Sequence, residues 1–199
     1  KKDIASARAY VTGLGFFGSL ITFAGYALTT RNPGYLWLAS FGFVINWFCD
    51  SLDGTLARYR KAERPRFGFY IDHVIDVVSA VLVFTSLGIS PYVDITIACF
   101  ALIGYLMLST LVYITTYVNG MFRISYAGLG PTELRLMAII ANAVIFFIGN
   151  PVVSTPFGNL ALYDAIIAVI AGLLFLFFIV SALIQIKQLV NIDQIDKSI

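Results

Sequence analysis

The chain has 199 residues, of which 59% are hydrophobic and only 12% are charged. About a quarter of the residues of a soluble domain are charged, so this composition excludes an ordinary soluble domain and indicates a membrane protein. The formal net charge of +2 is too small to indicate a nucleic-acid partner. One histidine and two cysteines, both within apolar runs, give no indication of a zinc site or a disulfide.

Six apolar runs follow one another along the chain, each close to the about 20 residues that cross a bilayer. Prolines and glycines separate them, as in Asn32-Pro33-Gly34 and Ser90-Pro91. We therefore expect an all-α, polytopic membrane protein with a single domain over residues 1–199. The six predicted transmembrane helices are Tyr10–Thr29, Tyr35–Ala57, Gly68–Ile89, Val93–Val118, Thr132–Ile148 and Ala161–Gln185.

The lysines and arginines are distributed unevenly between these predicted helices. Of the thirteen, only Arg31 falls in a loop on one side, and the other twelve lie in the loops and terminal segments of the opposite side. Lysine and arginine are enriched in cytoplasmic loops of membrane proteins. The distribution therefore predicts an even number of spans with both termini cytoplasmic, in the plasma membrane if the source is microbial.

Four aspartates lie near the cytoplasmic ends of the second and third predicted helices. Asp50 and Asp53 are three residues apart, and Asp72 and Asp76 are four apart, so each pair shares one helix face. A short connection is expected to place the two helices side by side, so that the four carboxylates converge. Asp72 and Asp76 are embedded among apolar residues, which argues against a solvated loop.

Four carboxylates at this depth need a source of positive charge. Each costs about 2.5–3.5 kcal/mol at membrane depth on the insertion scale. No lysine lies within the predicted helices, and Arg58 can offset only one charge. Two divalent cations would balance the four aspartates, and ligands that are all oxygen atoms suit Mg²⁺ or Mn²⁺. The sequence therefore predicts a site for two divalent metal ions.

The residues around the aspartates form a longer pattern. It reads Asp50-x-x-Asp53-Gly54-x-x-Ala57-Arg58, followed by Gly68-x-x-x-Asp72-x-x-x-Asp76. This pattern resembles the signature of the CDP-alcohol phosphotransferase (CDP-alcohol phosphatidyltransferase) family, whose members transfer a phosphoryl-linked group from a CDP-alcohol to an acceptor alcohol. The nine residues between Arg58 and Gly68 are one more than the family usually has. An extra residue in a surface loop is well tolerated.

The resemblance implies a role for each of these residues. Asp50, Asp53, Asp72 and Asp76 would hold the metal ions, and Asp76 would also be the general base for the acceptor hydroxyl. The small residues beside the aspartates would let the nucleotide approach the helix backbone, although small residues also serve helix packing alone. The implied nucleotide-binding residues are Asp53, Gly54, Ala57, Arg58 and Gly68. The resemblance also implies a homodimer.

Three charged residues near the fifth predicted helix are candidates for binding the acceptor or another part of the substrate. Arg123 and Arg135 lie on the cytoplasmic side and could hold a phosphorylated acceptor, or could serve only as positive-inside anchors. Glu133 could bind substrate, but it also suits the positive start of a helix. The compact chain resembles members that use CDP-diacylglycerol as donor and glycerol phosphate, inositol phosphate or serine as acceptor.

Two alternatives remain at this point. His73 directly after Asp72, and the run Gly130-Pro131-Thr132-Glu133, are similar to the choline/ethanolamine branch, which uses CDP-choline or CDP-ethanolamine and diacylglycerol. The second alternative is a cation transporter, because acidic residues in membranes often mark ion paths. A transporter would need acidic or polar residues near the bilayer centre in several helices. The fourth and fifth predicted helices have none there apart from Asn142. The clustering of acids at one edge favours an enzyme.

Overall fold

The computed structural model describes the backbone of residues 2–59, 65–119, 131–155 and 158–196, and side chains within 13–52, 70–71, 73–118, 132–154 and 158–191. These residues form six helices and one short β-hairpin. In chain order they are α1 (Lys2–Leu28), α2 (Tyr35–Tyr59), α3 (Pro65–Ile89), α4 (Ile95–Asn119), α5 (Pro131–Ile148), β1 (Val152–Thr155), β2 (Gly158–Ala161) and α6 (Leu162–Asp196).

All six predicted helices are present, and several boundaries agree closely with the prediction. The turn between α1 and α2 forms at Asn32-Pro33-Gly34, where the Asn32 side chain accepts a hydrogen bond from the Gly34 backbone N–H at 2.7 Å. Two helices exceed the prediction, because α1 begins at Lys2 and α6 continues to Asp196.

The expectation of an all-α chain is wrong in one detail, because β1 and β2 form an antiparallel hairpin. Val152 pairs with Ala161, and Thr155 pairs with Gly158. Pro151 ends any helical continuation, and the β-branched residues that follow favour extended backbone. Gly158 has a φ of 123°, which side chains other than glycine rarely adopt.

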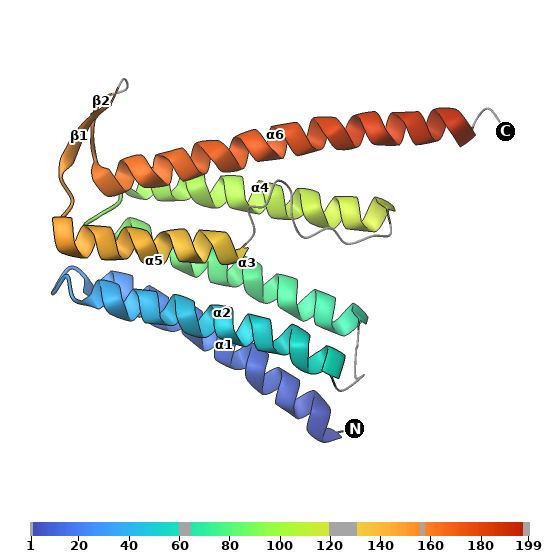
Figure 1. The fold of residues 1–199 in the computed structure, drawn as a ribbon, viewed down its shortest axis with the longest axis horizontal. Helices are drawn as coiled ribbons and strands as arrows, with labels where there is room; N and C mark the ends of the chain where they lie inside the picture. The colour runs from blue at the N-terminus through green and yellow to red at the C-terminus, as the bar shows by residue number, and fades with distance from the viewer. Residues whose placement is uncertain (1, 60–64, 120–130, 156–157, 197–199) are drawn as a thin grey trace.

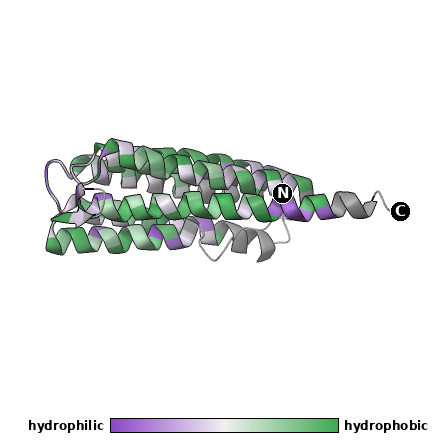
Figure 2. Ribbon diagram, turned by 90° about the horizontal axis from the view of Figure 1, so that it is seen from above, coloured by the Kyte–Doolittle hydropathy of each residue, from purple (hydrophilic) through white to green (hydrophobic). Residues whose placement is uncertain are grey.

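The helices form an elongated bundle, with both termini at one end and the hairpin at the other (Figure 1). α1 packs against α2 and α3, α3 against α4, and α4 against α6, while α5 packs mainly against α2 and has few contacts with α6. The two termini thus share a side, as predicted. Apolar residues extend along most of each helix (Figure 2).

Small residues bring α1 and α2 into close contact. A Cβ atom on Gly18 would lie 2.7 Å from the backbone nitrogen of Asn46, and one on Gly25 would collide with the backbone of Ala39. Glycines at such positions allow helix backbones to approach in membrane proteins. This contact fixes α2, which carries Asp50, relative to the rest of the bundle.

A buried polar network joins four helices near the hairpin end. Tyr26 and Tyr163 both donate hydrogen bonds to the Asn142 side-chain oxygen, at 2.9 and 2.6 Å. The Asn142 side-chain nitrogen donates to the Ser40 hydroxyl at 3.1 Å. All four side chains are buried. Because buried polar groups need partners, this network specifies how α1, α2, α5 and α6 fit together.

Two helices among the described residues are long and apolar enough to cross a membrane by themselves. They are Ile95–Val118 in α4 and Leu162–Asn191 in α6. Shorter apolar stretches cover Gly13–Leu28 in α1 and His73–Ile89 in α3. These lengths and compositions suggest a membrane protein.

Candidate active site

Asp50 and Asp76 meet at one arginine side chain. Arg135 Nη1 donates a hydrogen bond to Asp50 Oδ2 at 3.0 Å, and Arg135 Nη2 lies 3.9 Å from Asp76 Oδ1. The Arg135 side chain is 12% exposed, compared with 54% for Asp50 and 32% for Asp76. One guanidinium therefore links acidic residues from α2 and α3.

The prediction that α2 and α3 lie side by side is wrong. In the described part of the chain these two helices have no close backbone contact, and each packs against α1 instead. Because α1 lies against both helices, α2 and α3 face each other across an internal cavity. Arg135 from α5 lies between the two helices and contacts Asp50 of α2 and Asp76 of α3.

Arg135 changes the charge balance that the sequence suggested. The aspartates were expected to have too little positive charge nearby, with Arg58 as the only candidate. The Arg135 guanidinium contacts both carboxylates of the described pair and adds one positive charge, while two carboxylates carry two negative charges. Arg135 was predicted as a substrate-binding residue and not as a partner of the aspartates. A charge-assisted hydrogen bond of this kind is among the stronger interactions of a partly buried site.

Several other predicted residues lie in described helices without a described side chain. Their backbone belongs to α2 or α3, so each helix places them within a few turns of Asp50 or Asp76. They are Asp53, Gly54, Ala57, Arg58, Gly68 and Asp72. Arg123 lies outside the described residues. The roles predicted for these residues stay predictions.

Two further predicted residues have described side chains. Glu133 is exposed in the first turn of α5, two residues before Arg135. The His73 ring packs edge-on against Tyr113 of α4, with ring centroids 4.7 Å apart. His73 thus contacts α4 through its ring.

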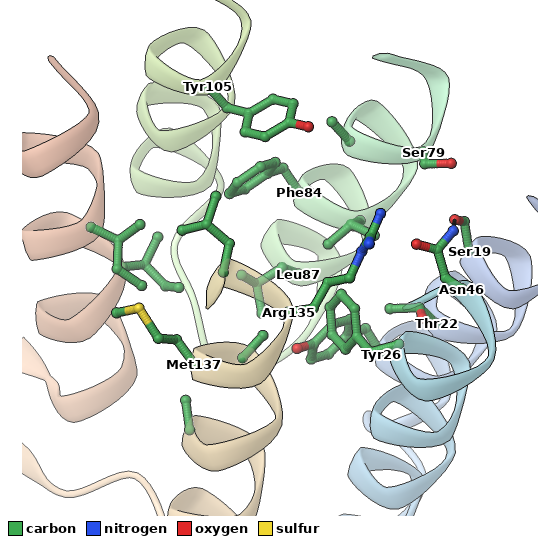
Figure 3. Close-up of a pocket in the computed structure, with 18 of the residues that line it drawn as sticks. Ser19, Thr22, Tyr26, Asn46, Ser79, Phe84, Leu87, Tyr105, Arg135 and Met137 are labelled. Atoms are coloured by element: carbon green, nitrogen blue, oxygen red, sulfur yellow. Dashed lines mark hydrogen bonds between the residues drawn. The ribbon is translucent and has the colours of Figure 1, made fainter. Parts of the chain in front are cut away.

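A cavity of about 110 Å³ extends from this site into the bundle. Asp76 and Arg135 both line this cavity, and Asn46, Ser79 and Tyr105 surround the Arg135 guanidinium (Figure 3). The deeper part is lined mainly by apolar side chains from α3, α5 and α6, and Tyr26 and Tyr163 lie at the far end. The site is therefore polar at its mouth and apolar inside.

Comparison with known proteins identifies the family. The family model described as CDP-alcohol phosphatidyltransferase matches residues 9–184. The chain belongs to this family. A curated relative, the archaetidylinositol phosphate synthase of Methanothermobacter thermautotrophicus, is 26% identical over 148 residues, which cover 74% of this chain and 71% of the relative. No solved structure gives a significant match.

As a CDP-alcohol phosphatidyltransferase, the protein is an enzyme that transfers a substituted phosphate group from a CDP-alcohol donor to an alcohol acceptor. This activity places it in phospholipid biosynthesis. Membership removes the main support for the cation-transporter alternative. The family resemblance noted in the sequence is confirmed.

The CDP-alcohol phosphatidyltransferases generally use divalent metal ions. Among the residues with described side chains, no three histidines, cysteines, aspartates or glutamates gather into a metal-binding group. The side chains of Asp53 and Asp72 lie outside that set. The described pair fits a hard cation in its chemistry, because Asp50 and Asp76 present carboxylate oxygens within reach of one small cationic group.

Most residues that line the cavity were not predicted from the sequence. Ser79 follows Asp76 by three positions, so both lie on one face of α3. That spacing was the available signal, but a serine within an apolar helix also suits helix packing. Asn46 and Tyr105 come from helices whose relative positions the sequence does not specify.

Proposed function

We propose that this chain transfers a phosphatidyl group from a CDP-diacylglycerol-type lipid to a small polar alcohol that carries a phosphate, with release of CMP. The observation that carries this proposal is the position of Arg135. Its guanidinium lies at the mouth of an apolar cavity, between two carboxylates of the family pattern. An acidic pair, a fixed arginine and an adjoining apolar space suit a reaction between a polar acceptor and a lipid donor.

The name of the curated relative favours a phosphorylated polyol as acceptor. That relative is described as an archaetidylinositol phosphate synthase. Arg135 offers donors in the planar arrangement that binds phosphate well. In this proposal Arg135 holds the acceptor phosphate, with Arg123 as a second candidate and Glu133 beside the entrance. The donor's nucleotide lies against Asp53, Gly54, Ala57, Arg58 and Gly68.

The transfer step needs one proton acceptor at the site. The acceptor hydroxyl oxygen forms a bond to the phosphorus that bears the lipid, and the phosphoanhydride bond to CMP breaks. CMP leaves with the bonding electrons, and Asp76 takes the hydroxyl proton. Asp76 suits this role because it is the described carboxylate that lines the cavity and is less exposed than Asp50.

The metal ions in this proposal are Mg²⁺ or Mn²⁺, held by Asp50, Asp53 and Asp72 with partial participation of Asp76. When bound, they neutralise charge on the pyrophosphate and on the departing CMP. Arg135 shares Asp50 and Asp76 with this site, so its guanidinium and a cation compete for the same oxygens.

In our proposal all six helices cross the membrane, with the site at the cytoplasmic face. Both termini lie at the end of the bundle where α2 ends and α3 begins, while the hairpin lies at the other end (Figure 1). The excess of lysine and arginine at the first end supports a cytoplasmic assignment. A homodimer and a single domain over the whole chain complete the proposal.

The test is CMP release by the purified protein in lipid nanodiscs. CDP-dioleoylglycerol and CDP-ethanolamine are each supplied with an acceptor panel of inositol phosphate, glycerol phosphate, serine and dioleoylglycerol. We expect release with CDP-dioleoylglycerol and a phosphorylated alcohol. Release only with CDP-ethanolamine and dioleoylglycerol would contradict the proposal and support the choline/ethanolamine branch.

A further inference from the structure

The internal cavity has a polar end and a long apolar body that the transfer chemistry does not use. We propose that it binds the first part of a hydrocarbon chain of the glycerolipid substrate, with Ser79 donating a hydrogen bond to the oxygen that links this chain to glycerol. This inference rests on the proposed function, since it names where the lipid part of that reaction is held.

Ser79 is the first observation that points to a ligand. Its side chain is 8% exposed, and its hydroxyl oxygen has no hydrogen-bond partner among the described residues. It lies on the wall of the cavity, three residues beyond Asp76, or about 4.5 Å further along the helix axis (Figure 3). A buried hydroxyl without a partner is destabilising, so an oxygen supplied by a ligand accounts for its place.

Other polar groups on the cavity wall already have partners within the protein. Asn46 donates to the Gly15 carbonyl at 2.9 Å and to the Ser19 hydroxyl at 3.0 Å. Thr22 donates to the carbonyl of Ala39 at 3.2 Å. A polar acceptor such as a sugar phosphate meets the Arg135 donors at the mouth of the cavity but finds few free donors on the wall beyond it. A ligand with one oxygen near Ser79 and no polar group beyond it fits this wall.

The deeper part of the cavity matches a hydrocarbon chain. Its walls include Val83, Phe84 and Leu87 of α3, Ala141 of α5, and Ile167 and Ile170 of α6. The distance from Asp76 to Leu87 along α3 is about 16 Å, which is roughly half of a bilayer's hydrocarbon core. The network of Tyr26, Asn142 and Tyr163 closes the far end.

The packing of α5 suggests the route by which a chain enters. Both α5 and α6 line the cavity, yet these helices have few contacts with each other in the described part of the chain. A hydrocarbon chain that passes between these helices moves from the apolar bilayer into an apolar cavity. The hydrophobic effect therefore contributes little to its binding. Binding at this site therefore selects the shape of the chain, and a bulky side chain in the cavity should exclude it.

The first arm of the test fills the cavity with Ala138→Phe, because Ala138 lines it. Ile140→Phe is the matched control, since Ile140 is 55% exposed on the same helix. We expect Ala138→Phe to raise the KM for CDP-dioleoylglycerol at least tenfold. The inhibition constant of CDP-glycerol, a competitor without a chain, should change less than twofold. The control should leave both values unchanged.

The second arm removes the hydroxyl with Ser79→Ala, which tests the proposal even if Ala138→Phe does not fold. We expect the KM for CDP-dioleoylglycerol to rise about three- to tenfold, the range for one neutral hydrogen bond. The melting temperature should stay equal or rise, because no internal partner is lost. Ser86→Ala is the control, because Ser86 does not line the cavity. Its hydroxyl donates a hydrogen bond to the Val83 carbonyl at 2.8 Å.

The outcomes separate this inference from the proposed function. If the protein uses CDP-ethanolamine and dioleoylglycerol instead, the same variants should raise the KM for dioleoylglycerol, and the cavity then binds the acceptor's chain. Unchanged KM values for the chain-bearing substrate in both Ala138→Phe and Ser79→Ala would overturn the inference. A lower melting temperature of Ser79→Ala with an unchanged KM would also overturn it.

Discussion

Arg135 is the residue on which the charge of the site depends. Its guanidinium contacts Asp50 and Asp76, two carboxylates that would otherwise repel each other at the mouth of an apolar cavity. It has a neighbour of opposite charge on each of two helices, so it holds α2, α3 and α5 in register at this end. The same planar group suits the phosphate of an acceptor. Arg135 therefore has competing partners. Its replacement should weaken binding of a phosphorylated acceptor and strengthen binding of Mg²⁺.

We predict that Arg135→Gln raises the KM of a phosphorylated acceptor about 10- to 100-fold, because hydrogen bonds to charged groups contribute about 1.5–3 kcal/mol. The concentration of Mg²⁺ at half-maximal rate should fall, since Asp50 and Asp76 lose a competing cation. Steady-state kinetics with varied acceptor and varied Mg²⁺ measures both. Arg31→Gln, an exposed change at the opposite end, should alter neither. An unchanged acceptor KM in Arg135→Gln would exclude its role in acceptor binding.

Asp76 should be separable from the other aspartates by kinetics. If it takes the acceptor proton, Asp76→Asn lowers kcat about 10²- to 10⁴-fold, while the affinities for Mn²⁺ and for the CDP-lipid change only a few-fold. Single-turnover CMP release and Mn²⁺ binding by electron paramagnetic resonance measure these quantities. Asp94→Asn is the control, because Asp94 accepts a hydrogen bond from the Thr96 N–H at 2.8 Å and asparagine caps equally well. Loss of Mn²⁺ binding in Asp76→Asn would identify a metal ligand instead of a base.

At the scale of the helices, the sequence predicted the elements better than their neighbours. Proline and glycine marked the start of α2 and both ends of α5, because these residues act locally. α6 continues to Asp196, beyond its apolar run. The polar residues that follow the run are compatible with a helix, so the helix does not end where the run ends. The separation of α2 from α3 depends on how α1 packs, which no local pattern reveals.

The same distinction applies to the site. The pairs Asp50 with Asp53 and Asp72 with Asp76 follow from helical spacing alone, and the family pattern followed from those residues. The contact between Arg135 and Asp50 joins positions 85 residues apart, and it depends on the packing of α5 against α2. The unpartnered hydroxyl of Ser79 was equally invisible, because a serine in an apolar helix usually bonds to its own backbone.

The contact between α1 and α2 can be tested with two glycines of the same helix. We predict that Gly25→Ala destabilises the protein by about 1–3 kcal/mol, because the added Cβ would collide with the Ala39 backbone. Gly13→Ala should be neutral or stabilising by up to about 1 kcal/mol, since nothing lies within 4 Å of its added Cβ. Thermal unfolding in detergent compares them. Equal shifts in the two variants would show that this contact does not limit stability.

At the scale of the whole molecule, the orientation in the membrane follows from the distribution of positive charge. We predict that a cysteine at position 63 is inaccessible to an impermeant reagent added outside intact cells, whereas one at Asn159 in the exposed hairpin is labelled. The parent for both variants lacks Cys49 and Cys99. Labelling of position 63 from outside, without labelling of position 159, would reverse the proposed orientation.

We propose that the aspartates of α2 and α3 hold the metal ions of this CDP-alcohol phosphatidyltransferase. The most direct measurement is CMP release from CDP-dioleoylglycerol and inositol phosphate as a function of free Mg²⁺, for the wild-type protein and for Asp50→Asn in nanodiscs. We expect no release in excess chelator, saturable recovery when Mg²⁺ is restored to the wild type, and no recovery in folded Asp50→Asn. Full release in chelator, or wild-type rates in Asp50→Asn, would contradict it.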